Sequence, residues 1–263
     1  MGYKTMDANE AVSRVSYKFT EIAGIYPITP ASPMAEKVDV LASKGEINFW
    51  GNKVKVIEME SEKGAIATVH GALQAGVLAT TYTASQGLLL MIPSIYKMAG
   101  EMLPGVIHVA ARSLSTHSLS IFGDHQDIYA VRQTGACMLS SSSVEEAYHM
   151  AMVSHLASIK SSLPFINFFD GFRTSHEIDK VKEIDLSKLE TLIDKKALRK
   201  FRDNGMISGA TTRGTAENED VYFQHTESRN DYYTKAIDNV IYYMDKINKI
   251  CKTDYKPFNY YGD

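Results

Sequence analysis

The sequence predicts an α/β protein with a doubly wound, mostly parallel sheet and a C-terminal arm that is extended and helical. Short apolar runs of strand length alternate with segments of helical periodicity, which is the pattern of βαβ units. Three of these runs end in a polar residue, namely Thr29, Glu62 and Arg112. Ligands of open parallel sheets bind in the crevice outside the carboxyl ends of the strands. The same pattern therefore predicts both the fold class and a site.

The first half of the chain is expected to open with a helix at 7–23, followed by a strand that ends at 27–29. Ser32 and Pro33 favour a helix through Leu41, because proline is preferred at the first helical position. The next expected elements are a strand at 54–59, a helix at 64–75, a strand at 79–83 and an apolar helix to about 102 that contains Pro93.

The second half continues the alternation and then changes in character. Ser143 and Glu146 have the spacing of an N-terminal capping pair, so a helix is expected at 144–158. After His176 charged helical stretches appear, so we expect an α/β domain at 1–180 and an arm at 181–263. The other expected elements are strands at 106–110, 136–139 and 164–169, a helix at 124–133, an extended segment at 204–224 and a final amphipathic helix at 231–252.

Composition excludes several classes of function. Hydrophobic residues make up 44% and charged residues 22%, as in an ordinary globular protein. The net charge of −3 argues against nucleic acid or anionic lipid as a partner. No apolar run has membrane-spanning length, and the first residues lack a signal-peptide pattern. Two cysteines far apart in sequence indicate a reducing compartment, so a cytoplasmic location is expected.

Each of the three polar residues has a structural and a functional interpretation. Glu62 could offset the dipole of the helix that follows, or exchange a proton with a ring nitrogen. Arg112 could form a structural ion pair, or bind a carboxylate through its planar fork. Thr29 could belong to a local turn, or be held in place for a substrate by the prolines at 27 and 30.

Other polar features favour structural roles. The run from Asp124 to Asp127 has the spacing of helix capping rather than of metal ligands. His70 and His108 lie in apolar segments and are expected in the core, as are the methionines at 91, 98 and 102. The sequence contains no nucleophile elbow, phosphate-binding loop or dinucleotide fingerprint.

Several motifs, in chain order, resemble the N-terminal domain of the pyruvate:ferredoxin (flavodoxin) oxidoreductases. The resemblance covers essentially the whole chain and departs from the family pattern mainly at 206–211. The motifs that carry it are Tyr26–Pro30, Glu58–Glu62, Thr83–Pro93, Ser120–Asp127, Phe169–His176, Arg213–Thr215, Val221–Gln224 and Tyr260–Gly262.

This resemblance implies the thiamine-diphosphate-binding fold and an oxidoreductase that converts pyruvate to acetyl-CoA and CO2. Electrons would pass to ferredoxin or flavodoxin. Glu62 would be catalytic and contact N1′ of the cofactor's aminopyrimidine, while Thr29 and Arg112 would bind pyruvate. The family also uses Mg²⁺, coenzyme A and iron–sulfur clusters of the 4Fe–4S type, and its full-length chains form homodimers.

The residues limit what this chain can do alone. Two cysteines cannot supply the four thiolates of such a cluster. Gly123 and Asp124 lack the second glycine and the downstream asparagine of the family's magnesium motif. We therefore expect the pyrimidine-side domain alone, with no metal ligands of its own, weak affinity for thiamine diphosphate and no turnover without the remaining domains.

Two alternatives stay open at this stage. One is a related 2-oxoacid:ferredoxin oxidoreductase that acts on another 2-oxo acid, since a threonine and an arginine would suit any of them. The other is a non-catalytic assembly domain that kept the fold. Replacement of Glu62 by Gln separates the second alternative from an enzyme, because only an enzyme would lose activity.

Overall fold

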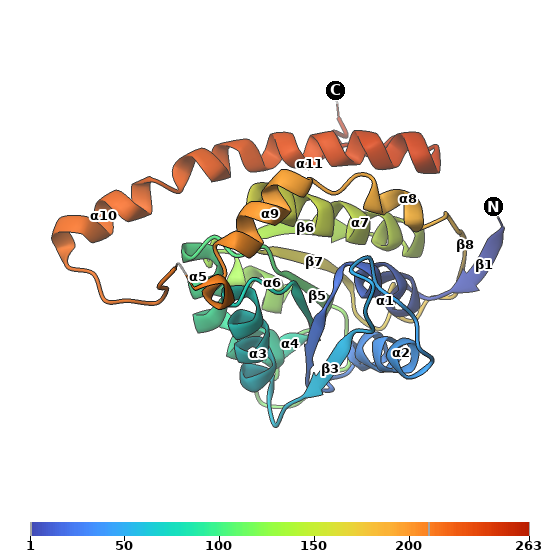
Figure 1. The fold of residues 1–263 in the computed structure, drawn as a ribbon. Helices are drawn as coiled ribbons and strands as arrows, with labels where there is room; N and C mark the ends of the chain where they lie inside the picture. Colours follow the sequence, from blue (N-terminus) through green and yellow to red (C-terminus); the bar gives the residue numbers. More distant parts are fainter. Residues whose placement is uncertain (1, 210, 263) are drawn as a thin grey trace.

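The computed structural model describes residues 2–209 and 211–262, and its centre is a parallel sheet of six strands (Figure 1). The strand order is β3-β2-β4-β5-β7-β6, and every neighbouring pair is parallel. The predicted fold class is therefore confirmed. The strands are β2 (Ile22–Ile25), β3 (Lys55–Glu58), β4 (Ala79–Thr83), β5 (Val106–Ala111), β6 (Cys137–Ser141) and β7 (Phe165–Asp170).

Helices flank this sheet in two groups (Figure 1). The first group is α1 (Ala8–Phe19), α2 (Ser32–Ser43) and α7 (Val144–Ser161). The second group is α3 (Glu62–Gln74), α4 (Ser85–Leu90), α5 (Ile92–Gly100) and α6 (Gln126–Val131). Helix α7 begins as expected, because the Ser143 side chain accepts a hydrogen bond from Glu146 N.

The expected helix at 7–23 is too long. Helix α1 ends at Phe19, and the hydroxyl of Thr20 bonds both the Ser16 carbonyl and the Thr80 side chain. The chain then enters the sheet, where Glu21 N donates to the Leu78 carbonyl. The strand that was expected to end at 27–29 stops at Ile25, since the prolines at 27 and 30 have no N–H for the ladder.

Two further helices differ from expectation. The apolar segment before residue 102 is divided into α4 and α5 at Met91, because Pro93 cannot donate a hydrogen bond to the preceding turn. The helix expected at 124–133 is reduced to α6. Of the two histidines expected in the core, His108 is fully buried, whereas the side chain of His70 is 14% exposed and bonds Glu101 at 3.1 Å.

A second, two-stranded sheet pairs the two ends of the α/β region. Strand β1 (Tyr3–Met6) runs antiparallel to β8 (Asp179–Lys182). Neither strand was expected, because both are short and largely exposed. The proposed division at residue 180 falls within β8 and stays a prediction.

The C-terminal part is helical where an extended segment was expected. Helix α10 includes Val221–Gln224, and the acidic residues Glu219 and Asp220 in its first turn stabilise its N-terminus. Residue 210 of that segment, and Asp263 of the aromatic tail, lie outside the described residues. The elements here are α8 (Ser187–Glu190), α9 (Lys195–Asp203), a 3₁₀ turn (Met206–Ser208), α10 (Glu219–Glu227) and α11 (Asn230–Cys251).

The final amphipathic helix is confirmed as α11, which packs along α7 (Figure 1). Arg213, from one of the family motifs, fixes the segment before α10. It donates to the carbonyls of Glu101 and Asn204. None of the helices in residues 2–209 and 211–262 is long and apolar enough to cross a membrane.

Candidate functional site

The sheet topology brings four strand ends to one rim. Strands β3, β2, β4 and β5 are consecutive neighbours in the sheet. From β2 the chain crosses to β3 on one side and then to β4 on the other, so the strand order reverses at β2. Such a switch point opens a crevice at the carboxyl ends of the strands. Thr29, Glu62 and Arg112 all follow strands of this group.

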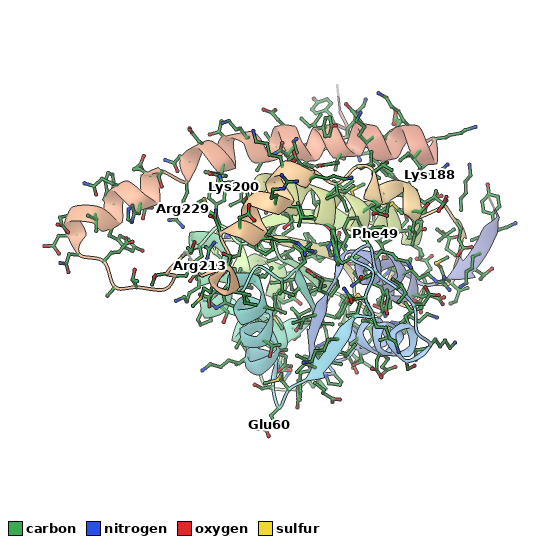
Figure 2. All side chains as sticks on the ribbon, in the orientation of Figure 1. Phe49, Glu60, Lys188, Lys200, Arg213 and Arg229 are labelled. Carbon is green, nitrogen blue, oxygen red and sulfur yellow. The ribbon has the colours of Figure 1, made fainter. Side chains whose placement is uncertain are left out.

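Glu62 is the first residue of α3 and is only 8% exposed. Ser61 caps the helix by accepting a hydrogen bond from Gly64 N. Two other carboxylates precede Glu62 in the sequence, but Glu58 and Glu60 are exposed. Figure 2 shows Glu60 pointing away from the body of the protein. Of these three carboxylates, only that of Glu62 is therefore buried at the carboxyl ends of the strands.

Arg112 and Thr29 are in direct contact. Arg112 is 7% exposed, and its Nη1 donates to the Thr29 carbonyl oxygen at 2.6 Å. Thr29 itself is exposed at the rim. This bond joins the chain after β2 to the end of β5, two strands away in the sheet.

Electrostatics connect Arg112 to Glu62. Burial lowers the pKa of Arg112, and the negative charges of Asp127 and Glu62 oppose that shift. Both carboxylates therefore lie within electrostatic range of the guanidinium. The structure thus places Arg112 in contact with the backbone of Thr29 and within electrostatic range of Glu62.

Gly87 of α4 packs directly against the Glu62 side chain. A Cβ atom at this glycine would lie 2.6 Å from Thr83 Oγ1 and 2.8 Å from Glu62 Oε1. Real Cβ atoms essentially never come that close. Glycine is therefore required for α4 to pack this tightly against the Glu62 carboxylate.

Several buried polar atoms at the rim have no hydrogen-bond partner among residues 2–209 and 211–262. They are Thr83 Oγ1, Arg112 Nε and Ser113 Oγ. Buried polar atoms are normally paired, and unpaired ones need an explanation. Their position beside Glu62 and Arg112 is what a polar ligand at this rim would account for.

The sequence interpretation missed Asp127, which was assigned to helix capping with its neighbours. Asp124 makes a local bond at the start of α6, since its side chain accepts from Gln126 N, although His125 is the N-cap residue. Asp127 instead is fully buried and accepts from the backbone N–H groups of Ser85 and Arg112. His125 pairs with Asp170 at 2.8 Å.

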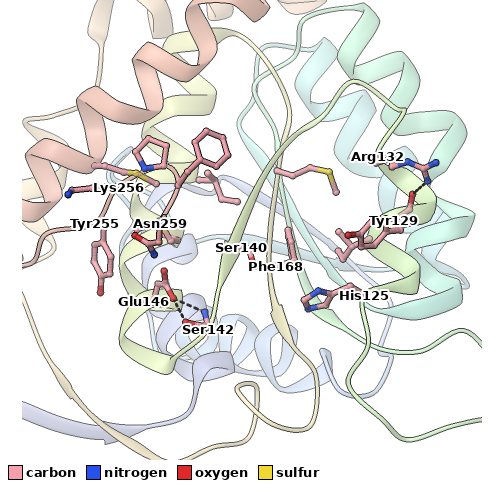
Figure 3. A pocket seen from close by; sticks show the side chains of 17 residues that line it. His125, Tyr129, Arg132, Ser140, Ser142, Glu146, Phe168, Tyr255, Lys256 and Asn259 are labelled. Atoms are coloured by element: carbon pink, nitrogen blue, oxygen red, sulfur yellow. Dashed lines mark hydrogen bonds between the residues drawn. The ribbon is translucent and has the colours of Figure 1, made fainter. Parts of the chain in front are cut away.

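A cavity of about 600 Å³ lies elsewhere (Figure 3). It is lined by α6, β6, α7 and the segment 255–259, with Arg132 and Lys256 on opposite sides. Glu146 is held there by two hydrogen bonds from Ser142. None of the three predicted site residues lines this cavity.

Among residues 2–209 and 211–262, no group of three or more His, Cys, Asp or Glu residues is arranged to hold a metal ion. Cys137 and Cys251 are both free. Burial raises the pKa of Cys137 to about 11 and that of Cys251 to about 12, which leaves both as inert thiols at neutral pH.

Comparison with known proteins identifies one family over most of the chain. Residues 14–245 match the family described as "Pyruvate flavodoxin/ferredoxin oxidoreductase, thiamine diP-bdg". The pyruvate-flavodoxin oxidoreductase of Enterobacter agglomerans is 55% identical over 98% of this chain. The pyruvate:ferredoxin oxidoreductase of Moorella thermoacetica is 51% identical over 100% of it. The chain spans 22% of the length of each of these two relatives.

A solved structure has the same fold. It is the 2-oxoglutarate:ferredoxin oxidoreductase from Magnetococcus marinus, which aligns with a TM-score of 0.62 over 71% of this chain and 32% of its own. Its sequence identity is 22%, so this likeness concerns the fold alone. Together with the family match over residues 14–245, the chain belongs to the pyruvate flavodoxin/ferredoxin oxidoreductase family and corresponds to its thiamine-diphosphate-binding domain.

Proposed function

We propose that this chain supplies the pyrimidine-side half of the thiamine diphosphate site in an enzyme that oxidatively decarboxylates pyruvate. The products would be acetyl-CoA and CO2, with electrons passed to ferredoxin or flavodoxin. The observation that carries the proposal is the contact of Arg112 with Thr29 at 2.6 Å, with the buried Glu62 in electrostatic range. An acid, a cation and a hydroxyl at one switch point suit a small 2-oxo acid beside a cofactor ring.

Glu62 is proposed as the catalytic acid–base group. Its side chain is buried between α3 and α4, and the N-terminus of α3 favours a negative charge there. None of the side-chain hydrogen bonds among the described residues uses its carboxylate. It is therefore available to hold a proton on a ring nitrogen such as N1′ of an aminopyrimidine.

Arg112 and Thr29 are proposed to bind the substrate. One nitrogen of Arg112 is committed to the Thr29 carbonyl, while its buried Nε has no partner among the described residues. A planar guanidinium can present the remaining donors to a carboxylate. The hydroxyl of Thr29, held by this bond, would face the same ligand.

The residues at the rim fit the cofactor. A heterocycle with donors and acceptors would pair the orphaned Thr83 Oγ1 and Ser113 Oγ, and Gly87 keeps its approach to Glu62 free of side chains. When bound, thiamine diphosphate supplies the carbon nucleophile that makes loss of CO2 from a 2-oxo acid feasible. This chain's own contribution is to orient the ring, carry its proton and fix the substrate carboxylate.

Other components belong to the whole enzyme. The iron–sulfur clusters are proposed for other domains, since the two cysteines here are far apart and free. Mg²⁺ and the contacts to the diphosphate are proposed for other domains as well. Coenzyme A as acyl acceptor, a homodimer of the full-length chain and a cytoplasmic location are likewise proposals. They rest on the family to which the chain belongs.

The experiment that tests this function replaces Glu62 by Gln in the full-length enzyme. We expect pyruvate-dependent reduction of ferredoxin to fall by about 10³-fold or more, about 4 kcal/mol in barrier height. Glu60→Gln, at an exposed carboxylate two residues earlier, is the matched control. Activity within a few-fold of the unmodified enzyme would refute the catalytic role and favour an assembly domain.

A further inference from the structure

Asp127 accepts backbone hydrogen bonds from two different strand ends. Its Oδ2 receives Ser85 N at 2.7 Å and Arg112 N at 3.1 Å, while its Oδ1 receives Ile128 N at 2.8 Å. The carboxylate is completely buried. Only the bond to Ile128 is local, so helix capping does not explain the other two.

These two donors belong to the segments that carry the proposed site. Ser85 opens the turn after β4, with a positive φ of 49°, and that turn leads to Gly87, whose backbone packs on the Glu62 carboxylate. Arg112 follows β5 and bonds Thr29. The Asp127 carboxylate thus joins the turn that packs on Glu62 to the backbone of Arg112.

Two further hydrogen bonds link the same pair of segments. Ser85 Oγ donates to the Ser113 carbonyl at 2.8 Å, and Gln86 Nε2 donates to the Ser115 carbonyl at 3.1 Å. Burying a charge is costly unless it is well paired. A neutral residue could fill the same space, but only a carboxylate offers two acceptor oxygens for three N–H groups.

We propose that Asp127 is a positioning residue, which holds the ends of β4 and β5 in register so that Glu62 and Arg112 face one ligand. This inference rests on the proposed function. It assigns Asp127 no contact with the substrate or the cofactor. Its effect would pass through the backbone at Ser85 and Arg112.

Asp127→Asn tests the role with little change in volume. Asparagine has one acceptor oxygen, so either its NH2 group turns toward the N–H groups of Ser85 and Arg112 or it turns toward Ile128 N. We expect amide hydrogen exchange at Ser85 and Arg112, measured by NMR on this chain, to accelerate at least about 10-fold. Asp124→Asn, which affects only a local bond to Gln126, is the control.

The kinetic arm uses the full-length enzyme. We expect Asp127→Asn to lower kcat/KM for pyruvate about 10- to 100-fold, because small misplacements of catalytic groups are costly, and to leave the KM for coenzyme A unchanged. If this variant fails to fold, Asp127→Glu decides, since it keeps the carboxylate but moves its oxygens relative to the N–H groups of Ser85 and Arg112. It should lower kcat/KM for pyruvate several-fold and leave the KM for coenzyme A unchanged.

Unchanged exchange at both amides, or pyruvate kinetics equal to those of the Asp124 control, would overturn the positioning role. An equal fall for pyruvate and coenzyme A, with faster exchange throughout the chain, would also overturn it in favour of a general structural role. Retained activity in Glu62→Gln would overturn the proposed function instead. Loss in that variant together with normal pyruvate kinetics in Asp127→Asn overturns the positioning role alone.

Discussion

Gly87→Ala is the perturbation that separates the placement of Glu62 from its chemistry. The added Cβ would lie 2.6 Å from Thr83 Oγ1, 2.7 Å from Glu62 Cγ and 2.8 Å from Glu62 Oε1. Gly87 is not among the residues with positive φ, so the backbone accepts alanine without strain. The effect of the substitution is therefore steric, and it is directed at Glu62 and Thr83.

The size of the effect follows from these distances. Ordinary contacts of a Cβ atom begin at 3.4 Å, so Glu62 Oε1 has to retreat by about 0.6 Å or more. The contact with Thr83 Oγ1 is shorter still, and Thr83 is β-branched and stiff on its strand. The start of α4 therefore has to shift away from Thr83 while the Glu62 side chain is displaced. Overpacking of this kind costs about 1–3 kcal/mol in stability. A displaced acid–base group should cost about 10- to 100-fold in kcat.

The assay measures pyruvate-dependent ferredoxin reduction by the full-length enzyme, and urea unfolding of this chain. Gly71→Ala is the matched control, because Gly71 lies in the same helix as Glu62 and a Cβ there meets nothing within 4 Å. The control should gain about 0.5–1 kcal/mol of stability and keep its activity. Full activity in Gly87→Ala would refute the placement of Glu62 against α4.

The remaining predictions concern the substrate, the pH dependence of stability and the isolated chain. Arg112→Ala should raise the KM for pyruvate about 10- to 100-fold and leave coenzyme A kinetics unchanged; equal changes in both would refute its role. Burial lowers the pKa of His108 to about 3, that of His149 to about 4 and that of His155 well below its ordinary value. Because the unfolded chain protonates all three below about pH 6.5 and the folded chain does not, stability should fall between pH 7.5 and pH 5 by about 2 kcal/mol for each of these histidines. Urea unfolding at the two pH values checks this, and a pH-independent midpoint would contradict it. The isolated chain should bind thiamine diphosphate weakly in calorimetry and show no pyruvate turnover; turnover by the chain alone would contradict the need for other domains.

The strands of the main sheet were predictable because parallel strands are buried on both faces and read as apolar runs. β4, for example, matches its expected range of 79–83. The errors arise where a distant partner decides the structure. The segment Ile22–Ile25 continues a helical pattern in sequence, but pairing with β3 and β4 makes it a strand. β1 and β8 exist only through each other.

The residues of the site also divide into those that the local sequence indicates and those that depend on distant partners. Thr29, Glu62 and Arg112 could be found because each follows a strand-like run. Asp127 could not, because two of its three donors come from other segments of the chain. The available signal was an acid within a short helix whose neighbours Ile128 and Val131 are buried. The requirement for glycine at position 87 depends on how α4 packs against α3, which no local pattern reveals.

The most direct test is a structure of the full-length enzyme with thiamine diphosphate and pyruvate bound. We expect a carboxylate oxygen of Glu62 within hydrogen-bond distance of N1′, and the pyruvate carboxylate on the guanidinium of Arg112 beside Thr29. A cofactor ring whose N1′ faces another acid, or a pyruvate bound out of reach of Arg112, would contradict the shared rim.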